Sequence, residues 1–84
     1  MSQEETPGTI RGRLNVLEKG LISEENSVQY YQSLIDKNPA GDEESIGARR
    51  MYEALKAEEM KHVQHFRDQI DFWENKLRDL TPDP

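Results

Sequence analysis

Apolar residues recur every three or four positions along two long segments of the chain. The first stripe alternates steps of four and three residues, the heptad spacing of a helix that packs along one face. Its positions are Ile10, Leu14, Leu17, Leu21, Glu24, Val28, Tyr31 and Ile35. The second stripe also advances by three or four residues, through Tyr52, Leu55, Glu59, His62, Phe66, Ile70, Trp73, Leu77 and Leu80. Two long amphipathic α-helices are therefore expected.

Turn-forming residues separate these two segments from each other and from the chain ends. Glycine and proline cluster at Pro7-Gly8, at Asn38-Pro39-Ala40-Gly41 and at Thr81-Pro82-Asp83-Pro84. Such clusters stop helices and form turns. The sequence thus predicts a flexible head over 1–8, one helical-hairpin domain over 9–80 and a short tail over 81–84. Within the domain we expect a helix over about 9–37, a loop over 38–44 and a helix over about 42–80.

Local signals support both helix starts and mark one weak point. Thr9 is a suitable cap for the first helix, and Asp42 for the second, with Glu43 and Glu44 near the positive end of the helix dipole. Gly20 lies inside the first helix, where glycine costs about 1 kcal/mol relative to alanine. It is a candidate for a bend, but the apolar stripe continues across it without a phase change, which argues against a full break.

The composition indicates that one hairpin does not complete the fold. The chain has 84 residues, of which 33% are apolar, and it has no cysteine. Chains of this size usually need a disulfide, a metal or a partner subunit to become stable. The absence of cysteine excludes disulfides, thiolate zinc sites and cysteine-ligated iron–sulfur clusters. An antiparallel hairpin covers each stripe from one side only, so we expect an all-α protein in which two hairpins dimerise into a four-helix bundle.

Charge and hydropathy exclude several kinds of partner. The net charge is −6 and no basic block occurs, which argues against binding to nucleic acid. No run of 18 apolar residues exists, so we expect no membrane span. The first five residues are polar and acidic, unlike a signal peptide. A cytoplasmic protein is therefore expected.

Three polar residues interrupt the apolar stripes: Glu24, Glu59 and His62. An ionised carboxylate in a bundle core is unfavourable unless it is paired or bound to a metal. Glu59 and His62 form a Glu-x-x-His step, which places both side chains on one helix face. Two chains would offer four carboxylates and two imidazoles, the ligand set of carboxylate-bridged di-iron bundles. These donors suit iron, and manganese fits them as well. The sequence predicts a metal site at the dimer interface.

Neighbouring polar and aromatic residues are weaker candidates. Glu25 and Glu58 point about 100° away from the ligand positions, toward solvent or a channel mouth. His65 is one turn beyond the predicted ligand histidine and is better explained as a surface residue. Tyr31, two turns after Glu24, either donates its hydroxyl to a ligand carboxylate or simply packs in the core. The other large aromatic residues on or beside the stripes are interpreted as core or interface residues: Tyr30, Tyr52, Phe66 and Trp73.

The spacing of these residues resembles that of known proteins. A glutamate seven residues before a tyrosine (Glu24 and Tyr31), followed by Glu59-x-x-His62, resembles the ferritin-like superfamily, especially its rubrerythrin-type helices. The single hairpin is most similar to the encapsulated ferritins, two-helix half-ferritins in which an aromatic pair follows the first ligand. Tyr30 and Tyr31 occupy that position here. The resemblance covers about 14–80.

The resemblance implies a ferroxidase that oxidises Fe(II) with dioxygen for iron storage or detoxification. Glu24, Glu59 and His62 would be its catalytic metal ligands at a di-iron site between two subunits, supported by Tyr31 from outside the ligand set. The implied assembly is a ring of dimers, commonly a decamer, inside an encapsulin shell. Two alternatives stay open. One is a rubrerythrin-like protein that reduces peroxide at a di-iron site. The other is a non-catalytic helical oligomerisation module whose polar core residues only fix the register.

Overall fold

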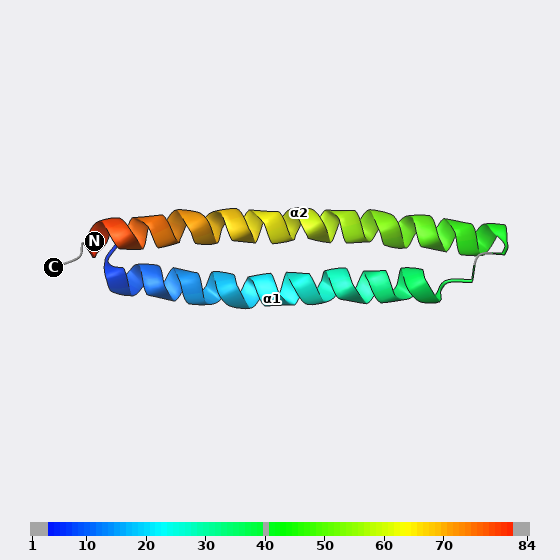
Figure 1. The fold of residues 1–84 in the computed structure, drawn as a ribbon, viewed down its shortest axis with the longest axis horizontal. Coiled ribbons are helices and arrows are strands. Elements are labelled where there is room, and N and C mark those ends of the chain that lie inside the picture. The colour runs from blue at the N-terminus through cyan, green and yellow to red at the C-terminus, as the bar shows by residue number, and fades with distance from the viewer. Residues whose placement is uncertain (1–3, 40, 82–84) are drawn as a thin grey trace.

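The structure, a computed structural model, describes residues 4–39 and 41–81. These residues form two helices, α1 (Pro7–Lys37) and α2 (Glu43–Leu80). The helices run antiparallel and side by side, so that the start of α1 lies next to the end of α2 (Figure 1). The predicted all-α hairpin is confirmed for the single chain.

The first helix begins two residues earlier than predicted because Thr6, not Thr9, is its N-cap. The backbone N–H of Thr9 donates to the Thr6 hydroxyl at 3.1 Å, and the Thr6 N–H donates to the Thr9 hydroxyl at 2.9 Å. This reciprocal pair satisfies two donors of the first turn. Pro7 follows at the first helical position, where its missing N–H is not needed. The predicted head over 1–8 is therefore too long; residues 1–3 lie outside the described part.

The second helix begins as predicted, with Asp42 as its N-cap. The Asp42 carboxylate accepts a hydrogen bond from the Ser45 N–H at 2.7 Å. This bond to the ionised form holds the pKa of Asp42 below its usual range. Across the turn, the Asn38 side-chain amide donates to the Ser45 carbonyl at 2.7 Å. The end of α1 is thus tied to the start of α2, which fixes the hairpin geometry.

The far ends of the predicted helices also agree with the structure. α1 passes through Gly20 without a break, as its continuous stripe predicts. α2 ends at Leu80, where Thr81 forms the C-cap. The rest of the predicted tail, 82–84, lies outside the described residues.

The hairpin is a single layer of helices. It measures 63 × 29 × 14 Å, and its radius of gyration is 18.9 Å. A compact domain of this length would have a radius of gyration of about 12 Å. A layer one helix thick leaves two broad faces of the hairpin without any covering element from the described part of the same chain (Figure 1).

Few side chains are buried within this layer. Among the described residues the buried hydrophobic ones are Ile10, Leu14 and Ile35, and α2 has no buried residue. Large apolar side chains remain exposed along both helices: Val16, Ile22, Tyr30, Ile46, Met51, Met60, Phe72 and Leu80. They are interspersed with charged residues, and neither helix in the described part is long and apolar enough to cross a membrane. Of these exposed residues only Leu80 belongs to a predicted stripe; the others lie beside the stripes, so the hairpin exposes apolar surface outside the seam between its helices.

Polar contacts connect the helices along one flank. The Arg67 guanidinium of α2 donates to the Glu25 carboxylate of α1 at 3.0 Å. The Lys56 ammonium donates to the Gln32 side-chain carbonyl at 2.5 Å. The Arg67–Glu25 ion pair is exposed and contributes little to stability, whereas the Lys56–Gln32 hydrogen bond is partly buried. Their effect is to keep these charged side chains directed away from the seam between the helices.

A second set of contacts closes the open end of the hairpin. The Arg13 guanidinium binds both carboxylate oxygens of Glu5, at 2.9 and 2.8 Å, and lies 4.4 Å from the ring centroid of Trp73. Hydrogen bonding to Arg13 lowers the pKa of Glu5. Arg13 thus connects the residues before α1 to the last part of α2 through an ion pair and a cation–π contact.

The hydrophobic core near this end is a first target for a test of the fold. Ile10 is completely buried, so Ile10→Ala should lower the free energy of unfolding by about 2–5 kcal/mol, and Ile10→Val by about 0.5–1.5 kcal/mol. Urea denaturation followed by far-ultraviolet circular dichroism, at one protein concentration, measures both. An equal effect of the two substitutions would show that Ile10 is not enclosed as described.

Candidate metal centre

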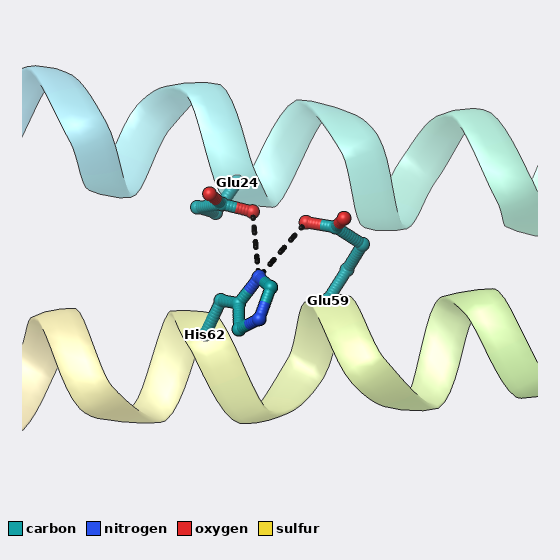
Figure 2. Close-up of side chains that lie close together, drawn as sticks. All are labelled: Glu24, Glu59 and His62. Carbon is teal, nitrogen blue, oxygen red and sulfur yellow. Dashed lines mark ion pairs between the residues drawn. The ribbon is translucent and has the colours of Figure 1, made fainter.

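Three side chains converge near the middle of the hairpin. Glu24 comes from α1, while Glu59 and His62 come from successive turns of α2 (Figure 2). Nδ1 of His62 lies 3.6 Å from Oε2 of Glu24 and 3.7 Å from Oε2 of Glu59. Each residue offers a ligand atom that lies within 4.8 Å of those of the other two. The structure therefore brings together the three residues that interrupt the apolar stripes.

The local fold explains this convergence. Glu59 and His62 are three residues apart on an unbroken helix, so their side chains project from the same face. Glu24 occupies the matching position of the α1 stripe, and the antiparallel packing directs it across the seam toward them (Figure 2). The apolar spacing that forms the hairpin thus also aligns the polar cluster.

The cluster is covered unevenly. The side chains of Glu24 and Glu59 are 26% and 22% exposed, whereas that of His62 is 53% exposed. Oε2 of Glu59 is inaccessible to solvent and has no hydrogen-bond partner. A buried carboxylate oxygen without a partner is unfavourable, and native structures rarely contain one. This oxygen lies beside an imidazole nitrogen and a second carboxylate, and these three groups could together hold a cation.

The electrostatics of the cluster favour an added positive charge. Hydrogen bonding to the Glu24 carboxyl raises the pKa of Glu59, and burial and repulsion by the Glu24 carboxylate act in the same direction. His62 opposes this shift. Glu59 therefore retains its proton more readily than an isolated glutamate does. A bound cation would replace that proton and relieve the repulsion.

The donor set and its spacing fit a divalent metal with oxygen and nitrogen ligands. Bonds of about 2.1 Å in octahedral geometry separate neighbouring donors by about 3.0 Å and opposite donors by about 4.2 Å. The separations of 3.6 and 3.7 Å lie between these values. Two carboxylates and an imidazole suit iron or manganese. Three protein donors leave such a metal with open coordination positions on the exposed His62 side.

The structure also places the other residues considered as candidates. Glu25 pairs with Arg67, and Glu58 pairs with Lys61 at 3.1 Å, so neither carboxylate belongs to the cluster. His65 is exposed, with its ring edge-on to Phe66 at 6.4 Å between centroids.

Tyr31 is half-buried, with its ring 5.5 Å from that of Tyr30 in an edge-on arrangement. This contact is consistent with packing between neighbouring aromatic side chains. A hydrogen bond from the Tyr31 hydroxyl to a ligand carboxylate stays a prediction.

The sequence does not predict that Gly20 and Phe66, which lie beside the cluster, contribute to the site. Gly20 of α1 lies directly against the ring of Phe66 of α2, one helical turn from the cluster. The sequence presents this glycine only as a weak point of its helix. The pairing of the smallest residue with a large aromatic one depends on the register of the two stripes, which the sequence does not specify.

No protein-family model, curated protein or solved structure shows significant similarity to the chain. The likeness to ferritin-like proteins therefore rests on residue types and spacing. The geometry of the cluster is an observation that does not depend on this likeness.

The raised pKa of Glu59 leads to a test in the metal-free protein. A carboxyl group whose pKa is raised on folding stabilises the fold below its unfolded-state pKa, and this contribution is lost as the pH rises through the folded-state pKa. The free energy of unfolding should therefore decrease, through this group, as the pH rises above 4.5, the ordinary pKa of a glutamate side chain. Glu24→Gln should reduce that decrease, because it removes the carboxyl group that contributes most to the shift while burial remains, whereas Glu25→Gln should retain it.

Urea denaturation of the parental protein, Glu24→Gln and Glu25→Gln over a series of pH values measures how the free energy of unfolding depends on pH in each. Carboxyl-carbon NMR titration of Glu59 gives the direct reading and should show a lower pKa in Glu24→Gln. The same pH profile and the same Glu59 titration in all three proteins would contradict the described coupling of Glu24 to Glu59.

Proposed function

We propose that the chain is a ferroxidase of the ferritin-like type, whose di-iron site forms between two copies. The observation that carries this proposal is the convergence of Glu24, Glu59 and His62 around a buried, unpartnered oxygen of Glu59. One chain supplies two carboxylates and one imidazole. Two chains supply a glutamate from each of two helices and Glu-x-x-His from each of the other two, the ligand set of di-iron carboxylate bundles.

Three features of the hairpin support a second copy as the missing part of the site. The hairpin is one helix thick, its described residues include few buried side chains, and large apolar side chains are exposed on both helices. His62 is half-exposed and completes the cluster on its uncovered side. A twofold dimer would cover the exposed side of the cluster and would bring the two ligand sets together.

The charges of such a site match its substrate. Four carboxylates from two chains carry a charge of −4, which equals the +4 of two ferrous ions when both imidazoles are neutral. Oxidation raises the charge of the iron pair to +6, and hard carboxylate oxygens favour the ferric state over the ferrous state. The protein thus balances the charge of the substrate ions when they bind as Fe(II) and stabilises their oxidised form.

The reaction is a transfer of electrons from iron to dioxygen. Each of two ferrous ions loses one electron, and one dioxygen molecule accepts both electrons and two protons to leave as hydrogen peroxide. The residues of the chain bind and orient the two ions.

Substitution of the ligands should separate this function from the alternatives. Glu24→Ala, Glu59→Ala and His62→Ala should each slow aerobic oxidation of ferrous iron by at least about 100-fold, because one change in the chain removes two ligands from a twofold site. Changes outside the ligand set of a metal site typically reduce affinity or activity by 10- to 100-fold. The matched controls are the adjacent or nearby residues Glu25→Ala, Glu58→Ala and His65→Ala, which should retain most of the rate.

The assay compares each variant with the spontaneous oxidation in buffer, and circular dichroism checks that the helices remain. Parental rates in the three ligand variants would refute the proposal. A parental protein that consumes peroxide rapidly with a reductant, but oxidises ferrous iron no faster than buffer, would favour the peroxide-reducing alternative. A chain that binds no metal would be an oligomerisation module.

A further inference from the structure

The contact between Gly20 and Phe66 is unusually tight. A β-carbon placed on Gly20 would lie 2.4 Å from Cε1 and 2.7 Å from Cζ of the Phe66 ring. Ordinary van der Waals contact begins at 3.4 Å. No side chain larger than hydrogen fits at this position unless the ring or the helix moves by about 1 Å.

This contact lies in the same seam as the polar cluster. Gly20 precedes Glu24 by four residues on α1, and Phe66 follows His62 by four residues on α2. Residues four apart share a helix face, so the contact lies about 6 Å along the helix axes from the ligands. The separation of the helices at the contact therefore controls their separation at the cluster.

We infer that Gly20 is a positioning residue for the metal site. The Phe66 ring rests on the bare backbone of Gly20 and sets the helix separation at which Glu24 reaches His62 across the seam, at 3.6 Å. This inference rests on the proposed metal site at the cluster. The ring and the glycine need not touch the metal, because they act through the backbone positions of the ligands.

A comparison with other glycines supports this role. Gly12 of α1 and Gly47 of α2 also lie inside helices, but a β-carbon on either would meet nothing within 4 Å. Glycine weakens a helix at all three positions. Only at Gly20, among these three, does the structure contain a neighbour that excludes a larger side chain. The glycine there is required by the approach of α2.

A metal site tolerates only small displacements of its ligand groups. Ligand groups must be held within about 0.5 Å of their working positions. Because the Phe66 ring is packed in the seam, we expect part of the shift of about 1 Å to be taken up by the helices, which exceeds this tolerance one turn away. Gly20→Ala should therefore weaken metal binding by about 10- to 100-fold, the range typical of residues that orient metal ligands.

Cobalt(II) is a suitable probe because its visible absorption reports both binding and ligand geometry without oxidation. Its dissociation constant should be measured for the parental protein, Gly20→Ala and Gly12→Ala at a temperature where circular dichroism shows all three to be helical. Helix propensity alone predicts that both alanine variants keep the parental affinity. The inference predicts that Gly12→Ala keeps the parental affinity and spectrum, while Gly20→Ala loses affinity by about 10- to 100-fold and changes the spectrum.

A rescue variant covers the case in which Gly20→Ala fails to fold. Leucine lacks Cε1 and Cζ, the two ring atoms that a β-carbon on residue 20 would approach most closely. Combining Gly20→Ala with Phe66→Leu should therefore restore both the helices and cobalt binding. Restored helices without restored binding would overturn the inference.

The outcomes separate this inference from the function on which it rests. Cobalt affinity in Gly20→Ala equal to that in Gly12→Ala would refute the positioning role and leave the metal site intact. Absence of cobalt binding in the parental protein, or unchanged binding in Glu24→Ala, would refute the metal site and the positioning role together.

Discussion

The approach of two carboxyl groups in the seam of a two-helix hairpin is the constraint on which the other features depend. Glu24 and Glu59 come close enough that Glu24 disfavours the ionised form of Glu59, as the raised pKa of Glu59 records. His62 is near enough to oppose this effect but does not supply a partner for the buried Glu59 oxygen. In the proposed function a positive ion resolves this conflict, and the carboxylate and imidazole donors suit iron or manganese.

Because the hairpin is a single layer of helices, it leaves apolar side chains exposed and also leaves the polar cluster partly uncovered. Most residues of both stripes are partly or fully buried in the seam, while large apolar side chains beside the stripes, such as Val16, Ile22 and Phe72, remain exposed. The ion pairs on the flank and the Arg13 contacts at the open end hold the two helices in register but do not cover these faces. In the proposed function, the association of a second hairpin would complete the metal site.

The sequence predicts the hairpin and the cluster well because one periodicity encodes both. Steps of three and four residues define the two helices, and the same steps place Glu24, Glu59 and His62 on the facing sides. The start of the first helix is less predictable. Thr6 and Thr9 are both good caps, and their reciprocal hydrogen bonds favour the earlier one, next to Pro7.

The close approach at Gly20 could not be predicted from periodicity. Helix propensity treats every internal glycine as a cost, and it gives no information on what lies opposite. The Phe66 ring can be placed against Gly20 only when the register of the two antiparallel helices is known. The same holds for the pairing of Glu25 with Arg67, since many other charged residues could satisfy either partner.

The central claim is that two copies of the hairpin share one pair of metal ions. Native mass spectrometry during an anaerobic titration with ferrous iron reads the number of chains and of ions in the same species. We expect iron to drive the protein into assemblies built from dimers, with one ion per chain, and we expect Glu59→Ala to prevent this change while Glu25→Ala does not. Monomers that bind iron without associating, or an assembly that does not respond to iron and contains none, would contradict the claim.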